Sequence, residues 1–274
     1  MRTELVTIPT PTHPLDGVYY TPDGPSKGAA MYCHGNQMNF YVCAARFLAP
    51  HITALGYEYL AFNRRGHDSV STYDSRDCVG GAYQTVAEGL EDNALAAKYL
   101  AERGFANPIV IGHSNGGVLA SEHAANHPET KALILLSAHA GGNRRTSPKA
   151  ASNFSLAGDT EAQQKEAEAL VAAGKPRQLM LIPAWWWVIS ARTYLDRLTN
   201  APDLVENAKR IKCPALFIRG DQEPKENYPA ERFAENCAGP CEVVIVPNCD
   251  HFYVGVEDRV SKIVTDWLRN KVGD

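Results

Sequence analysis

The sequence predicts an α/β fold in which a parallel sheet is covered by helices on both faces. Short apolar runs rich in Val, Ile and Leu alternate with longer amphipathic stretches, which is the pattern of repeated β–α units. The run at residues 131–137 is nearly continuously apolar, as expected for a strand buried on both faces of a parallel sheet. A second run, residues 109–111, leads through Gly112-His113-Ser114-Asn115-Gly116 into a helix-forming stretch, so strand, sharp turn and helix follow directly.

The elements of the first half follow from apolar runs and helix stop signals. Residues 5–8 and 18–21 flank turn residues, so we expect an antiparallel hairpin at a sheet edge. Residues 40–55 and 82–103 have helical periodicity and end at glycines, and the second stretch has acidic residues early and basic residues late, as the helix dipole favours. The strands expected in this half are residues 29–33, 57–62, 109–111 and 131–137, with a helix at 118–127.

The alternating pattern stops after Ala138 and resumes near residue 207. Residues 141–206 contain no clear strand, and two helices are expected there, at 159–173 and 183–198. We therefore predict a core domain made of residues 1–140 and 207–274, and a helical cap, 141–206, above the carboxyl ends of the strands. The core is completed by strands at 214–219 and 242–246 and by helices at 229–236 and 256–268.

Ser114 is the candidate nucleophile. A serine at the apex of a strand–turn–helix adopts a strained backbone conformation that exposes its hydroxyl, and glycines two residues before and after let strand and helix approach closely. The same Gly-x-Ser-x-Gly pattern also occurs by chance in turns, but the flanking strand and helix remove most such cases. The helix that follows directs its N-terminal N–H groups toward any negative charge that develops at the serine.

A base and an acid for this serine follow two later strands. His251 comes after the last strand and Asp221 after the strand before it, so all three loops would lie at one sheet edge. We predict that His251 accepts the Ser114 proton and that Asp221 orients the imidazole. Asp250 and Glu223 are rival acids: Asp250 is adjacent to His251, so its side chain diverges, and Glu223 is the reserve candidate.

The loop after residues 29–33, His34-Gly35-Asn36-Gln37, is expected at the same edge. There the backbone N–H of Asn36 would join that of Asn115 as an oxyanion hole, with Gln37 as the alternative donor and a candidate substrate contact. The alternative is a βα turn without chemistry.

The run Trp185-Trp186-Trp187 gives the cap its most unusual composition. Trp186 and Trp187 are candidate substrate contacts, and packing of all three rings is an equally good interpretation.

Composition argues against several other function classes. The 274 residues carry a formal net charge of −4 and no basic run, which disfavours nucleic-acid binding. No segment has the length of a signal peptide or a membrane span. Seven cysteines without metal or redox spacing indicate free thiols and a cytoplasmic location. No metal or organic cofactor is expected, and the oligomeric state stays open, a homodimer included.

Together these motifs resemble the α/β-hydrolase superfamily over nearly the whole chain apart from the cap. The matching pieces are His34-Gly35-Asn36, the arginine–glycine loop at residues 63–69, the elbow at 112–117, Gly220-Asp221 and Asp250-His251. The first two are most similar to small carboxylesterases and monoacylglycerol lipases. The resemblance implies a mostly parallel eight-stranded sheet and a serine carboxylic ester hydrolase acting through an acyl-enzyme. The tryptophans of the cap suggest a small ester with an apolar or aromatic acyl or alcohol group.

Other functions remain compatible with the same residues. A lactonase, an amidase or a carbon–carbon bond hydrolase could use the same triad on another bond. A non-catalytic small-molecule receptor could share the fold, and a scaffold could interact through the tryptophans.

Overall fold

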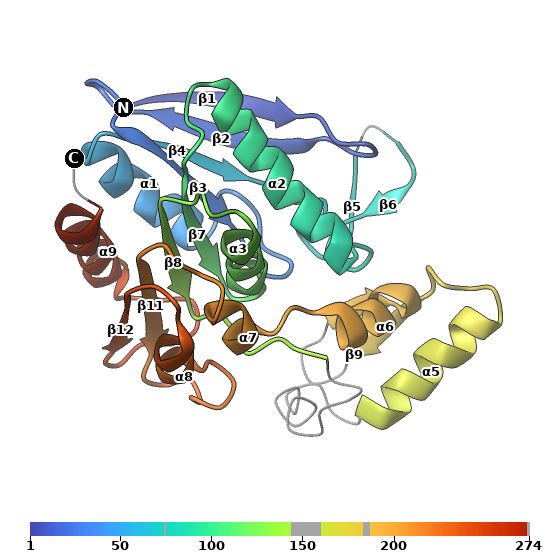
Figure 1. The fold of residues 1–274 in the computed structure, drawn as a ribbon. Coiled ribbons are helices and arrows are strands. Elements are labelled where there is room, and N and C mark those ends of the chain that lie inside the picture. The colour runs from blue at the N-terminus through green and yellow to red at the C-terminus, as the bar shows by residue number, and fades with distance from the viewer. Residues whose placement is uncertain (74, 144–159, 183–186, 273–274) are drawn as a thin grey trace.

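The computed structural model describes residues 1–73, 75–143, 160–182 and 187–272. Its main body is an eight-stranded sheet in the order β1-β2-β4-β3-β7-β8-β11-β12 (Figure 1). β1 pairs antiparallel with β2, and β2 antiparallel with β4, whereas the remaining neighbours are parallel. The predicted sheet and its edge hairpin are therefore confirmed. The strands are β1 (Arg2–Ile8), β2 (Leu15–Thr21), β3 (Gly28–Cys33), β4 (Tyr57–Phe62), β7 (Ile109–His113), β8 (Ala132–Leu136), β11 (Ala215–Gly220) and β12 (Cys241–Val246).

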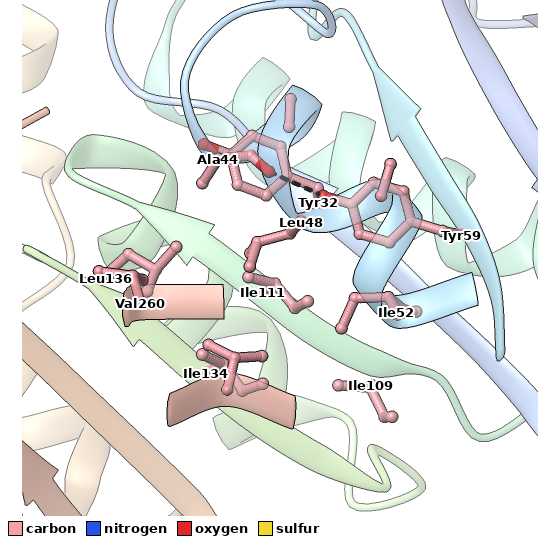
Figure 2. Close-up of a cluster of buried hydrophobic side chains, with 14 of the residues drawn as sticks. Tyr32, Ala44, Leu48, Ile52, Tyr59, Ile109, Ile111, Ile134, Leu136 and Val260 are labelled. Atoms are coloured by element: carbon pink, nitrogen blue, oxygen red, sulfur yellow. Dashed lines mark hydrogen bonds between the residues drawn. The ribbon is translucent and has the colours of Figure 1, made fainter. Parts of the chain in front are cut away.

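Helices cover both faces of this sheet. One apolar cluster joins α1 (Ala44–Ala54) and α9 (Glu257–Lys271) to one face, and Figure 2 shows Leu48 and Ile52 of α1 over Ile109 and Ile111 of β7. A second cluster joins the opposite face to four helices. These are α2 (Val86–Glu102), α3 (Asn115–Asn126), α7 (Leu204–Ala208) and α8 (Ala230–Asn236). Strand side chains alternate between the two clusters, which is why the central strands read as continuously apolar.

Two helices begin later than the periodicity predicts. α2 starts at Val86 because Thr85 and Glu88 form a capping box, each side chain accepting from the other residue's backbone N–H. α1 starts at Ala44, and the N–H of Phe40 instead donates to the side chain of Asn63 at 2.9 Å. A two-stranded ribbon, β5 (Ser71–Thr72) and β6 (Cys78–Val79), precedes α2.

The predicted all-helical cap is wrong, because the segment contains a β-hairpin. β9 (Leu179–Ile182) pairs antiparallel with β10 (Trp187–Ser190), between α5 (Thr160–Ala172) and α6 (Ala191–Asn200). Met180 and Ile182 are buried while Leu181 is half exposed, which is the period of a strand. The side chain of Ser190 accepts from the N–H of Thr193 and so caps α6, which therefore begins at Ala191.

The two ends of this inserted segment lie side by side. Gly141 forms a β-bridge with Asp203, and the N–H of Gly142 donates to the carbonyl of Pro202 at 2.9 Å. The hairpin, α5 and α6 share their own small apolar cluster. The division into core and cap domains stays a prediction. Within the described ranges, no helix has the length and apolar character needed to span a bilayer.

Candidate active site

The turn between β7 and α3 has the strained geometry expected of a nucleophile elbow. Ser114 sits there with φ 55° and ψ −124°, a conformation that residues with a Cβ rarely adopt. A Cβ added to Gly112 would lie 2.6 Å from the carbonyl oxygen of Gly116, and one added to Gly116 would lie 2.1 Å from the carbonyl oxygen of Cys33. Both glycines are therefore required by the close approach of strand and helix, as the motif predicts.

His113, beside the serine, joins the elbow to the loop that carries His251. Its Nε2–H donates to the carbonyl oxygen of His251 at 2.8 Å, and the two rings are 4.8 Å apart between centroids. Burial, followed by the nearby His251, lowers the pKa of His113 to about 3. His113 is therefore neutral at physiological pH, and its buried contact holds the His251 loop against the elbow. Sequence patterns do not reveal this role of His113, because the contact joins residues 138 positions apart.

Glu223, and not Asp221, lies against His251. The Oε1 atom of Glu223 is 2.6 Å from Nδ1 of His251, and the glutamate side chain is only 4% exposed. Its second oxygen, Oε2, accepts from the Ser137 hydroxyl at 2.5 Å and from the N–H of Gly220 at 2.9 Å. The reserve acid of the sequence analysis thus occupies the position that an orienting acid needs.

Asp221 does not contact His251 through its side chain, because its backbone still continues the pairing of β11 with β12. Its N–H donates to the carbonyl of Val246, and its exposed side chain accepts from the N–H of Cys249 at 3.1 Å. Backbone N–H groups of Asn248 and Cys249 lower the pKa of this carboxyl. The prediction that Asp221 orients His251 is therefore corrected: Asp221 fastens the turn before His251, while the chain folds back to bring Glu223 to the ring.

The loop after β3 is held firmly beside Ser114. The N–H of Arg64 donates to Nε2 of His34 at 3.0 Å, and its guanidinium donates to the carbonyl of His34. A Cβ added to Gly35 would lie 3.2 Å from Cβ of Ser114. This arrangement brings the residue after Gly35, Asn36, to the same cavity as Asn115.

A cavity opens between these loops and the cap. It has about 630 Å³ of space not occupied by atoms, part of which is open solvent. The lining is mostly apolar and comes from α2, α3, β10 and α6. The described lining residues are Asn36, Gln84, Thr85, Val86, Asn115, Leu119, His139, Ile189, Tyr194, Arg197, Leu198, Ala201 and Pro202.

The structure places none of the three predicted substrate contacts, Gln37, Trp186 and Trp187, in the described lining of this cavity. Gln37 does not line this cavity, and its Cγ instead lies 3.2 Å from where a Cβ on Gly81 would be. Trp186 lies outside the described residues. Trp187 pairs with Ile182 in the hairpin, but its side chain lies outside what the structure describes. No group of His, Cys, Asp or Glu within the described ranges is arranged to hold a metal.

Comparisons with known proteins agree with the fold. A model described as the alpha/beta hydrolase family matches residues 31–263. No curated protein sequence matches the chain.

Solved structures share the fold at low sequence identity. A soluble variant of monoglyceride lipase from Saccharomyces cerevisiae, in complex with a substrate analogue, is similar at 17% identity with a TM-score of 0.72, over 99% of this chain and 96% of that one. Est1E from Butyrivibrio proteoclasticus with bound ferulic acid is 17% identical with a TM-score of 0.73, over 97% and 99%. A thermostable carboxyl esterase from Bacillus coagulans is 15% identical with a TM-score of 0.71, over 99% of each chain.

Proposed function

Because the chain belongs to the α/β hydrolase family, we propose that it is a serine hydrolase that cleaves a carboxylic ester. One observation carries the proposal: the strained Ser114 elbow and a His251–Glu223 pair lie in loops at the carboxyl ends of β7, β12 and β11. His113 ties the first loop to the second through its contact with the His251 carbonyl. Such a constellation supplies a nucleophile, a base and an orienting acid.

The chemistry follows from the roles of these groups. Ser114 Oγ attacks the ester carbonyl while His251 takes its proton, and Glu223 holds the imidazole with its proton on Nδ1 and stabilises the imidazolium. The N–H groups of Asn36 and Asn115 stabilise the tetrahedral oxyanion. His251 then returns the proton to the leaving alcohol, which leaves an acyl-enzyme. Water activated by His251 attacks this ester, releasing the acid and regenerating Ser114.

The cavity lining supports a small apolar or aromatic substrate. Val86, Leu119, Ile189 and Leu198 present aliphatic side chains, and Tyr194 adds an aromatic wall. Apolar walls bind alkyl or aryl groups by removing them from water. Structural neighbours named as monoglyceride lipase and carboxyl esterase are in keeping with an ester as substrate.

Hydrolysis of a graded series of p-nitrophenyl esters tests the proposal. We expect turnover by the wild type, loss of turnover in Ser114→Ala, and rapid labelling of Ser114 by a fluorophosphonate. Labelling without turnover of any ester would redirect the assignment to a lactone, an amide or a carbon–carbon bond. Absence of both turnover and labelling would refute a hydrolase and favour a small-molecule receptor.

A further inference from the structure

Two hydroxyl groups behind the candidate acid form a buried chain that ends on its carboxylate. Ser137, directly after β8, places its Oγ 2.5 Å from Oε2 of Glu223 and 2.7 Å from the hydroxyl of Tyr253. The Tyr253 hydroxyl also lies 3.3 Å from the carbonyl oxygen of Ile218. Ser137 and Tyr253 are fully buried, so water does not compete for these contacts.

Counting the available protons determines which hydroxyl group donates in each of these hydrogen bonds. Ser137 has a single hydroxyl proton, and the carboxylate oxygen at 2.5 Å takes it, because an ionised carboxylate only accepts. Tyr253 must then donate to Ser137 at 2.7 Å, which leaves the carbonyl of Ile218 as the weaker, longer contact. Burial raises the pKa of Tyr253 well above its usual value, so this phenol keeps its proton.

We propose that Ser137 and Tyr253 are positioning residues, a hydroxyl relay that orients the Glu223 carboxylate toward His251. The inference rests on the proposed function, because it assigns a purpose to groups outside the triad. The Oε1 atom of Glu223 contacts Nδ1 of His251. Its Oε2 atom accepts from the hydroxyl of Ser137 and from the N–H of Gly220. With Oε2 anchored by Ser137 and Gly220, the carboxylate cannot rotate away from the imidazole.

The backbone at both hydroxyl-bearing residues is strained, which supports a dedicated role. Ser137 has φ 46° and Tyr253 has φ 64°, values in the left-handed region that residues with a Cβ disfavour. Strain of this kind persists where the surrounding structure holds it, and it gathers at functional sites. A glycine would relieve the strain at residue 137, but it would remove the hydroxyl that reaches Glu223.

This contrast gives a matched pair of variants. Ser137→Ala and Ser137→Gly both remove the hydroxyl, but only the glycine relieves the positive φ. We expect both to lower kcat about tenfold to a hundredfold with KM little changed, the size associated with one hydrogen bond to a charged group. A purely structural role predicts instead that Ser137→Gly keeps full activity and unfolds at or above the wild-type temperature.

Tyr253→Phe tests the far end of the relay. It should lower kcat less than Ser137→Ala, since Ser137 can still donate to Glu223. In the double variant Ser137→Ala/Tyr253→Phe the losses should not add, because the phenol acts only through the serine. Additive losses would overturn the relay.

A readout without substrate separates this inference from the proposed function. The Nδ1–H proton of His251, assigned by its loss in His251→Gln, should give a downfield proton NMR resonance that shifts in Ser137→Ala and Ser137→Gly. An unchanged resonance and an unchanged kcat would refute the relay. A shifted resonance in a protein that turns over no ester would support the relay and refute the ester hydrolase.

Discussion

Replacing Glu223 by glutamine tests the assignment of the acid without changing the size of the side chain. In the wild type, Oε2 of Glu223 accepts from the N–H of Gly220 at 2.9 Å and from the hydroxyl of Ser137 at 2.5 Å. An amide nitrogen in that place would meet a backbone N–H, which cannot reverse its polarity. We therefore expect the amide oxygen to occupy the Gly220 side and the amide NH2 group to face His251.

The consequence is a change of imidazole tautomer. Nδ1 of His251, which lies 2.6 Å from the replaced oxygen, must then accept from the amide, so the ring proton moves to Nε2. A histidine protonated at Nε2 cannot take the proton of Ser114. Loss of the correct tautomer at a serine triad costs about 10³- to 10⁴-fold in kcat. This corresponds to about 4 to 5.5 kcal/mol of transition-state stabilisation.

The assay is the rate of p-nitrophenyl ester hydrolysis by Glu223→Gln, with Asp221→Asn as the matched control. The control should stay within about threefold of wild type, because the exposed Asp221 side chain accepts from backbone N–H groups of the turn at Asn248 and Cys249. Thermal unfolding of both variants shows whether the fold is intact. A large loss in Asp221→Asn together with near-normal activity in Glu223→Gln would refute this assignment and restore Asp221 as the acid.

Three further predictions concern the elbow, the cavity and acid stability. Gly116→Ala should lower the free energy of unfolding by about 3 kcal/mol in urea titrations, because its Cβ would lie 2.1 Å from a backbone oxygen, whereas Gly24→Ala, in open space, should change it by less than about 0.5 kcal/mol. Leu198→Ala should move the ester-length optimum toward longer acyl chains, while Leu181→Ala, half exposed and outside the cavity, should leave it in place; equal shifts would contradict the cavity assignment. Burial lowers the pKa of His113 to about 3, so below pH 6.5 the unfolded chain binds a proton at this residue that the folded chain does not. The free energy of unfolding should therefore fall on acidification toward pH 3. Between pH 6 and 4 the wild type should lose about 1.4 kcal/mol of this free energy per pH unit more than His113→Gln.

The parts of this protein that the sequence determined are local. The strained turn at Ser114 follows from Gly112 and Gly116, because only glycine fits between a strand and a helix that approach this closely. The alternation of apolar runs and amphipathic stretches likewise indicated where the core strands lie along the chain and that helices cover both faces of the sheet, since side-chain periodicity reflects burial. Loops after parallel strands meet at one edge, so the neighbourhood of Ser114 and His251 was also predictable.

Tertiary structure alone decided which side chains meet within that neighbourhood. Asp221 and Glu223 are two residues apart in one loop, and only the fold-back of that loop shows that Glu223 reaches His251, 28 positions away. The contact of Ser137 with Glu223 spans 86 positions and that with Tyr253 spans 116. The hairpin of the cap was not predictable, because a short apolar run fits a strand or a helix equally well. The alternating burial of Met180 and Ile182 becomes visible only in the folded structure. Such contacts depend on side-chain direction and packing across the fold, which spacing along the chain does not determine.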